Sequence, residues 1–261
     1  MQVSFVTKIP KFERFGLITS ESLNLISFNL FNFINAKYVD SSEGVITGFD
    51  VTYDKNKKNF CVGKGILKIE ETVFFSNESI FLDIPEKEGR YCCVIEFYSK
   101  KDENYFENIL TVNLIDQKEY KGEFILFEII LREGADIEQD NNHFEEFRDE
   151  FNTINIIKQK YCVTYSKYST ISPKIMKKWA SVASYKMKIE TIDLNFIFLC
   201  LNSIVSKELI LAYIKEKLNI NLDICKTTNN DIVKYLSSVL RNKVKKESRD
   251  NKQSEEFFYI N

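Results

Sequence analysis

The sequence predicts an α+β fold, in which a β-rich domain built as an antiparallel sandwich or a barrel is followed by a small α-helical bundle. Two patterns lead to this prediction. Apolar and polar residues alternate along residues 44–132, as they do in half-buried strands. Beyond residue 172 apolar residues instead recur at three- and four-residue steps, which is the period of a helix. At 261 residues, with 44% apolar and 28% charged residues, the chain is long enough and apolar enough to bury a core.

We expect four parts along the chain. They are an N-terminal entry segment (1–40), the β-rich domain (41–152), the helical domain (153–245), and a polar linker with an aromatic tail (246–261). The entry segment favours an amphipathic helix that begins after Thr19-Ser20, a natural helix cap. A strand is the alternative, because Leu25 and Phe28 blur the helical spacing. The apolar positions that carry the helical spacing are Leu23, Ile26, Leu30, Phe33 and Ile34.

Seven or eight short strands are predicted in the β-rich domain, which is typical of a compact sandwich or barrel. Asp54–Lys58 supplies a polar hairpin loop, and Gly63 and Gly65 are interpreted as a structural turn or bulge that glycine permits through positive φ. Phe124–Leu131 is almost continuously apolar, as expected for a strand covered on both faces. The predicted strands are residues 45–53, 60–62, 66–69, 73–75, 80–84, 91–98, 109–115 and 124–131.

The helical domain follows an acidic boundary segment, residues 133–152, which contains eight Asp and Glu residues. Ser172-Pro173 is a strong helix start, because a capping hydroxyl is followed by proline at the first helical position. Residues 193–204 are predicted to form a buried helix, and Ser206 caps another that runs to Leu218. A last helix is expected to begin near Asn230, which makes four helices and a small bundle.

Composition argues against several functional classes. The net charge of −2 gives no global field toward nucleic acid or an anionic membrane, and eight glycines are too few for a long fibrous shaft. Six cysteines occur without a CxxC motif, so we interpret them as reduced and mostly buried. Residues 1–10 lack a signal-peptide core, and the most apolar stretch, 194–205, is well short of the ~20 residues of a spanning helix. We therefore expect a soluble protein made in a cytoplasm.

Groups that carry chemistry are scarce. His143 is the single histidine, and it lies beside Glu145 and Glu146, so a metal site is conceivable. A solvated acidic turn is the favoured interpretation, because nothing nearby has ligand spacing. Gly63-Lys64-Gly65 lies between strands and is no phosphate loop. We expect no catalytic, cofactor-binding or metal-binding residues, no cofactor, and no enzymatic activity.

Two lysine-rich stretches and the C-terminal tail are candidate interaction sites. Lys174–Lys188 holds five lysines and no acidic residue, and Arg241–Lys252 holds six basic residues. Either could face nucleic acid, but solvated helix faces, or contacts with the acidic segment, are favoured. The last apolar residues of the chain are expected to be docked rather than free in water. Two docking sites are equally favoured, the helical bundle of the same chain and a second subunit. The tail residues are Phe257, Phe258, Tyr259 and Ile260.

The order of strands and glycines in residues 41–150 resembles the adaptor domains of phage baseplate and tail-fibre attachment proteins, including those of phage-tail-like bacteriocins. The likeness covers about two-fifths of the chain. Its motifs are a Gly-Val-Ile-x-Gly strand, a Val-x-x-Gly-x-x-x-Ile strand, a later strand pair and a closing strand. They correspond to Gly44–Val51, Val62–Ile69, Tyr91–Phe97 and Phe124–Ile129.

This resemblance implies a structural tail or baseplate protein that docks on the particle and holds or presents a tail fibre. Its partners would be other tail or baseplate proteins, a fibre or receptor-binding protein, and further copies of itself in a homo-oligomer, without a membrane. It would belong to a virion tail or tail-like particle assembled in the bacterial cytoplasm. A receptor-binding tail protein that recognises cell-wall glycan is the alternative, followed by a nucleic-acid-binding phage protein.

Overall fold

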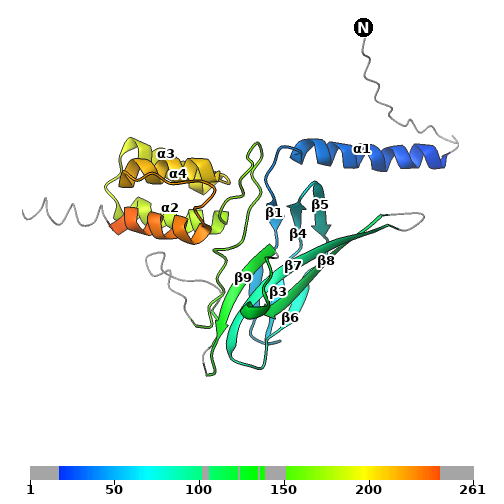
Figure 1. Cartoon of the computed structure of the whole chain (residues 1–261), viewed down its shortest axis with the longest axis horizontal. Coiled ribbons are helices and arrows are strands. Elements are labelled where there is room, and N and C mark those ends of the chain that lie inside the picture. The colour runs from blue at the N-terminus through cyan, green and yellow to red at the C-terminus, as the bar shows by residue number, and fades with distance from the viewer. Residues whose placement is uncertain (1–17, 102–105, 123, 135, 139–150, 242–261) are drawn as a thin grey trace, which may run out of the picture.

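The computed structural model describes residues 18–101, 106–122, 124–134, 136–138 and 151–241 (Figure 1). A β-rich part and a helical part lie beside each other, and the N-terminal helix α1 (Ser20–Tyr38) runs past the ends of β4 and β5. Nine strands are described: β1 (Gly44–Gly48), β2 (Val51–Asp54), β3 (Asn59–Val62), β4 (Gly65–Ile69), β5 (Thr72–Ser76), β6 (Ile80–Asp83), β7 (Gly89–Lys101), β8 (Phe106–Asp116) and β9 (Phe124–Leu131).

The strands form three antiparallel sheets of three strands each, with the orders β1-β4-β5, β2-β3-β6 and β8-β7-β9. The predicted α+β class and antiparallel pairing are therefore confirmed. The barrel alternative is not, because the nine described strands form three separate three-stranded sheets and do not close on one another. A short 3-10 helix, η1 (Gln117–Glu119), follows β8.

The three sheets enclose one apolar core. Phe60 and Phe127 meet at its centre, with ring centroids 5.1 Å apart. The alternation of β7 places Cys93 and Ile95 in this core, whereas Cys92 and Val94 form a second small cluster on the other face. Cys92 and Cys93 therefore face opposite sides of β7, as the alternation of side chains along a strand requires. The burial expected for most of β9 is confirmed, since Leu126 and Phe127 are fully buried.

Gly63 and Gly65 connect β3 to β4, but neither has positive φ, so that part of the prediction is wrong. Gly65 is required for another reason. A Cβ added there would lie 2.6 Å from the backbone nitrogen of Phe49 and 2.7 Å from the carbonyl oxygen of Thr47. The glycine lets two backbones approach closely. Positive φ is found instead at Gly48, on the opposite strand.

The helical part contains α2 (Pro173–Lys186), α3 (Thr191–Asn202), α4 (Lys207–Leu218) and a helix over residues 229–241. The starts at Pro173 and after Ser206 are confirmed, and the Ser206 hydroxyl accepts from the Leu209 amide at 3.3 Å. The Ser172 hydroxyl makes no such cap bond to α2. The fully buried Trp179 lies in the shared core, where its indole N–H donates to the Leu236 carbonyl at 3.1 Å.

Several expectations fall on residues outside the described ranges. These are His143 and most of the acidic boundary segment, the basic stretch after residue 241, and Phe257, Phe258, Tyr259 and Ile260. Within the ranges that are described, none of the helices combines the length and apolar character needed to cross a membrane.

Candidate docking surfaces

Helix α1 is a well-formed helix most of whose apolar residues are exposed. It begins with a capping box, in which the Thr19 hydroxyl accepts from the Ser22 amide and the Ser22 hydroxyl accepts from the Thr19 amide. The helix prediction is confirmed, but no residue of α1 is buried. An amphipathic helix normally hides its apolar stripe against a core. The exposed fractions here are 52% for Leu23, 45% for Ile26, 61% for Phe28, 58% for Leu30, 54% for Phe31 and 65% for Phe33.

This apolar surface continues from α1 onto the sheet beside it. Phe31 shares the lining of a hollow of about 350 Å³ with Phe74 and Phe75 of β5. Phe75 is itself 54% exposed. Because β5 is an edge strand of its sheet, α1 and this edge form one connected apolar region, which we call the α1 surface.

A second apolar surface lies on α3. The sequence predicts a buried helix here, but only Asp193, Phe196, Ile197 and Cys200 of α3 are buried. Leu194, Phe198 and Leu201 are exposed, with Phe198 at 66%. Their spacing of four and three residues places them on one face of the helix. We call these three residues the α3 surface. The spacing of these three residues is visible in the sequence. Because nearly all of their neighbours on α3 are apolar too, the sequence does not indicate which face of the helix is buried.

A buried polar network fixes α3 against α4. Asp193 is fully buried, and its carboxylate accepts from the Tyr213 hydroxyl at 2.8 Å. Lys217 lies 2.9 Å from Asp193 and 2.7 Å from Glu190. Burial alone would lower the pKa of Lys217, but its hydrogen bonds to Glu190 and Asp193 outweigh burial and raise it. Burial and the adjacent Asp193 carboxylate raise the pKa of Tyr213, so this hydroxyl stays a donor. The network therefore holds the α3 surface in a fixed orientation.

Aromatic packing supports the same arrangement. The rings of Phe196 on α3 and Tyr213 on α4 are stacked, with centroids 3.9 Å apart and an interplanar angle of 10°. Trp179 of α2 meets both rings edge-on, at centroid distances of 5.3 and 5.5 Å. Three helices thus meet at one aromatic cluster, which gains from both ring geometry and burial.

Residues 151–171, which we call the linking segment, join the β-rich part to the helices. The segment has little regular structure, yet its backbone is hydrogen-bonded to strands on one side. The Glu128 and Asn155 backbones exchange two bonds of 2.8 Å, and the Val45 amide donates to the Lys160 carbonyl at 2.8 Å. The Val45 carbonyl in turn accepts from the Cys162 amide at 2.9 Å. No period of two or 3.6 marks these residues, so the sequence does not predict how the segment is held.

The same segment is bonded to the helical part. The Thr170 hydroxyl donates to the Val205 carbonyl at 2.7 Å, and this bond is buried. The side-chain amide of Asn229 donates to the carbonyls of Ile157 and Gln159, at 2.9 and 3.2 Å. An ion pair of 2.7 Å between Lys174 of α2 and Asp50 spans the two parts directly. These contacts hold the two parts as one unit.

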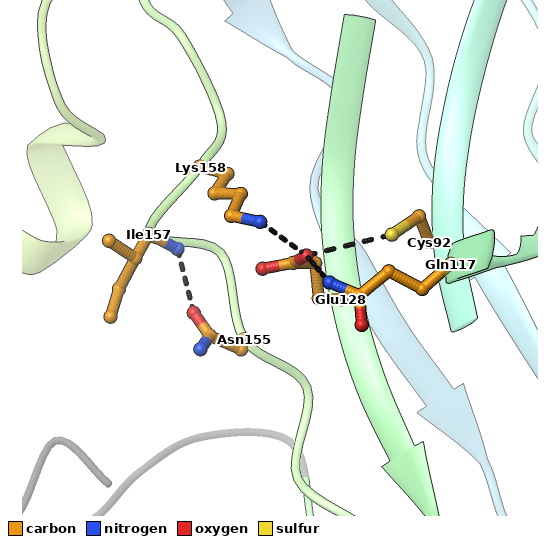
Figure 2. A network of polar contacts seen from close by, with 6 residues as sticks. All are labelled: Cys92, Gln117, Glu128, Asn155, Ile157 and Lys158. Atoms are coloured by element: carbon orange, nitrogen blue, oxygen red, sulfur yellow. Dashed lines mark hydrogen bonds and ion pairs between the residues drawn. The ribbon is translucent and has the colours of Figure 1, made fainter. Parts of the chain in front are cut away.

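Figure 2 shows the polar centre of this junction, around Glu128 on β9. One carboxylate oxygen of Glu128 lies 2.7 Å from Lys158 Nζ, 3.4 Å from Gln117 Nε2 and 3.6 Å from Cys92 Sγ. Glu128 is only 19% exposed and Lys158 35%, so the pair is partly shielded from water. Burial, followed by the charge of Glu128 and its hydrogen bond, raises the pKa of Cys92 to about 12.

The predicted lysine-rich face of α2 is partly engaged, since Lys174 pairs with Asp50. Among the described residues no cluster of His, Cys, Asp and Glu has the arrangement of a metal site. No protein family, curated protein or solved structure matches this chain.

Proposed function

We propose that this chain is a structural component of a phage tail or tail-like particle, which docks on the baseplate and attaches or presents a tail fibre through protein–protein contacts alone. The observation that carries the proposal is the presence of two exposed apolar helix surfaces on two firmly joined parts of one molecule. The α1 surface belongs to the β-rich part and the α3 surface to the helical part. A connector needs two such separate contacts and a stiff body between them.

Many kinds of assembly use connectors. We assign this one to a tail or baseplate because residues 41–150 resemble tail-fibre attachment domains. In this proposal the β-rich part meets the baseplate, and the helical part meets the fibre or receptor-binding protein. The exposed apolar area on α3 is of the kind that marks a protein contact. Assembly would take place in the bacterial cytoplasm.

Deleting the gene is expected to give particles that lack distal fibres or baseplates, which electron microscopy of purified particles would reveal. Fully decorated particles from the deletion strain would refute the proposal.

A point variant sharpens the experiment. Complementing the deletion with Phe198→Asp is expected to leave the protein folded but largely absent from purified particles, because a charge on the α3 surface opposes burial. Tyr185→Asp is the matched control, since Tyr185 is a 91% exposed aromatic residue on the neighbouring α2. Quantitative immunoblotting of particles measures incorporation. Equal incorporation of the two variants would contradict a role for the α3 surface.

A further inference from the structure

A hollow of about 310 Å³ lies where the linking segment meets the β-rich part and the starts of the last two helices. Its volume is at the lower end of the range for small-molecule sites. Lys158, Lys160 and Lys207 contribute to its lining, and none of the lining residues is Asp or Glu. The hollow therefore gathers positive charge from separate parts of the chain.

Two of the three lysines have no counter-ion. Lys158 is neutralised by Glu128, whose carboxylate lies 2.7 Å from its Nζ (Figure 2). Lys160 and Lys207 form no ion pair with any of the described residues. Because both line the same hollow, it holds two positive charges that the described residues leave uncompensated.

Lys207 is an unfavourable residue for the fold alone. It is half-buried, and burial is the largest cause that lowers its pKa, with the positive charge of Lys160 lowering it further. Cys225 and Glu208 act in the opposite direction, but neither lines the hollow. Lys207 is also the first residue of α4, where the positive end of the helix dipole disfavours a cation. A bound anion would offset all of these effects.

We propose that this hollow binds a small organic phosphate ester, with its phosphate group held by Lys160 and Lys207. A phosphate monoester carries a charge of about −1.5 to −2 at pH 7, which matches two cations. Ser169 of the linking segment adds a hydroxyl donor to the lining. Asn229 and Asn230 also line the hollow, and they begin the helix over residues 229–241, whose N-terminal end favours an anion.

The rest of the lining favours an ester over a bare phosphate ion. Tyr120 and Ile125 add aromatic and apolar surface, which only an organic group would use. A nucleic acid fits less well, because a polymer backbone is followed by a row of cations, whereas two are concentrated here in one hollow. The ligand would contact β9, the linking segment and α4 together. The inference does not depend on the tail assignment.

The first test is isothermal titration calorimetry of the full chain with three probes, at an ionic strength held constant with sodium chloride. We expect inorganic phosphate to bind with a millimolar dissociation constant, and adenosine monophosphate about tenfold more tightly, because its organic group adds contacts. Adenosine lacks the phosphate and should bind at least about tenfold more weakly than adenosine monophosphate. Absence of binding by both phosphates at about 10 mM, or equal affinities for adenosine and adenosine monophosphate, would overturn the proposal. Phosphate binding without a gain for adenosine monophosphate would exclude the ester.

Variants locate the site. Lys160→Met and Lys207→Met should each weaken binding of adenosine monophosphate at least about tenfold, because each removes a charge-assisted hydrogen bond. Lys207→Arg keeps the charge and should retain most of the affinity. Lys215→Met is the matched control, an exposed lysine on the same helix outside the hollow, with an expected change within about twofold.

Lys207→Met is expected to fold, since a cation at the first position of a helix is unfavourable, and circular dichroism checks this. Equal losses of affinity for Lys207→Met and Lys215→Met would mean that the anion binds non-specifically to surface charge. That result would overturn the proposal. So would tighter binding of a short DNA duplex than of adenosine monophosphate, if Lys207→Met abolished it, because nucleic acid would then be the ligand.

Discussion

Two neighbouring cysteines show how local sequence determines the environment of a residue. Cys92 and Cys93 follow each other in β7, so alternation sends one thiol to each face of the sheet. This was predictable from the sequence alone. The contact between Cys92 and Glu128 was not, because Glu128 lies 36 positions away on β9 and meets Cys92 through the pairing of β7 with β9.

At the residue scale we predict that the reactivity of Cys92 depends on Glu128 and Lys158. At pH 8 Cys92 should resist alkylation, because its pKa is about 12 and little thiolate forms. Glu128→Gln should lower this pKa and speed alkylation at high pH, although burial, the largest cause, keeps the pKa raised. Lys158→Met should raise the pKa further, because a nearby positive charge is lost.

Mass spectrometry of Cys92 after iodoacetamide treatment between pH 7 and 10 measures this reactivity. The Cys61→Ser/Cys225→Ser background removes the two cysteines that are not buried. Equal alkylation rates in the background variant and in its Glu128→Gln derivative would contradict the role assigned to Glu128.

At the scale of elements, the starts of helices were readable because they depend on a few adjacent residues. Ser172-Pro173 and Ser206 each mark a helix start locally, and the structure begins α2 and α4 there. The covering of a helix depends on distant residues instead. The sequence therefore predicted the α1 helix but not its exposure, and it predicted a buried α3 although Leu194, Phe198 and Leu201 face outward. Both candidate docking surfaces were missed for this reason.

Local sequence also does not predict which strands pair with one another. The predicted strand positions overlap β3 to β9, since alternation and turns are local signals. The single strand predicted over residues 45–53 is wrong, because the chain divides there into β1 and β2, which belong to different sheets. The partition into three sheets depends on pairings such as β3 with β6, which no spacing reveals. A barrel and a set of open sheets have the same strand pattern, so only tertiary contacts separate them.

For the α3–α4 pair, we predict that Lys217→Met destabilises the protein by about 3 kcal/mol, because it leaves the fully buried carboxylate of Asp193 without its cation. The double variant Lys217→Met/Asp193→Asn should lose less than the sum of the two single variants, because the two residues act as a pair. Urea unfolding measures the free energies. Lys215→Met, an exposed lysine on the same helix, is the control, with an expected change within about 0.5 kcal/mol. If Lys217→Met and Lys215→Met lowered the free energy of unfolding by similar amounts, the stabilising role assigned to the Lys217–Asp193 pair would be contradicted.

At the scale of the whole molecule, the linking segment joins two apolar cores that are otherwise separate. One core contains Phe60 and Phe127 of the strands, and the other contains Trp179 and the helices. Tyr161 and Thr170 pair with each other inside the segment, with backbone bonds of 2.8 and 3.0 Å, while Val45 bonds to residues 160 and 162 on the strand side. In the proposed role as a connector, the α1 surface and the α3 surface would keep a fixed relative geometry only if this segment stays bonded.

Trypsin provides a direct test of that bonding, because the segment contains three lysines in different environments. The peptide bond after Lys160 should resist cleavage, since the Lys160 carbonyl accepts from the Val45 amide and the Tyr161 amide donates to the Thr170 carbonyl. The bond after Lys167 should be cut first, because Lys167 is exposed and follows Tyr165, which is 90% exposed and has a positive φ of 60°. Mass spectrometry of brief native digests gives the order of cuts. Cleavage after Lys160 as early as after Lys167 would contradict this prediction and would mean that a flexible segment joins the two parts. The Val45→Pro variant loses the amide that donates to the Lys160 carbonyl, so we expect early cleavage after Lys160 in that variant.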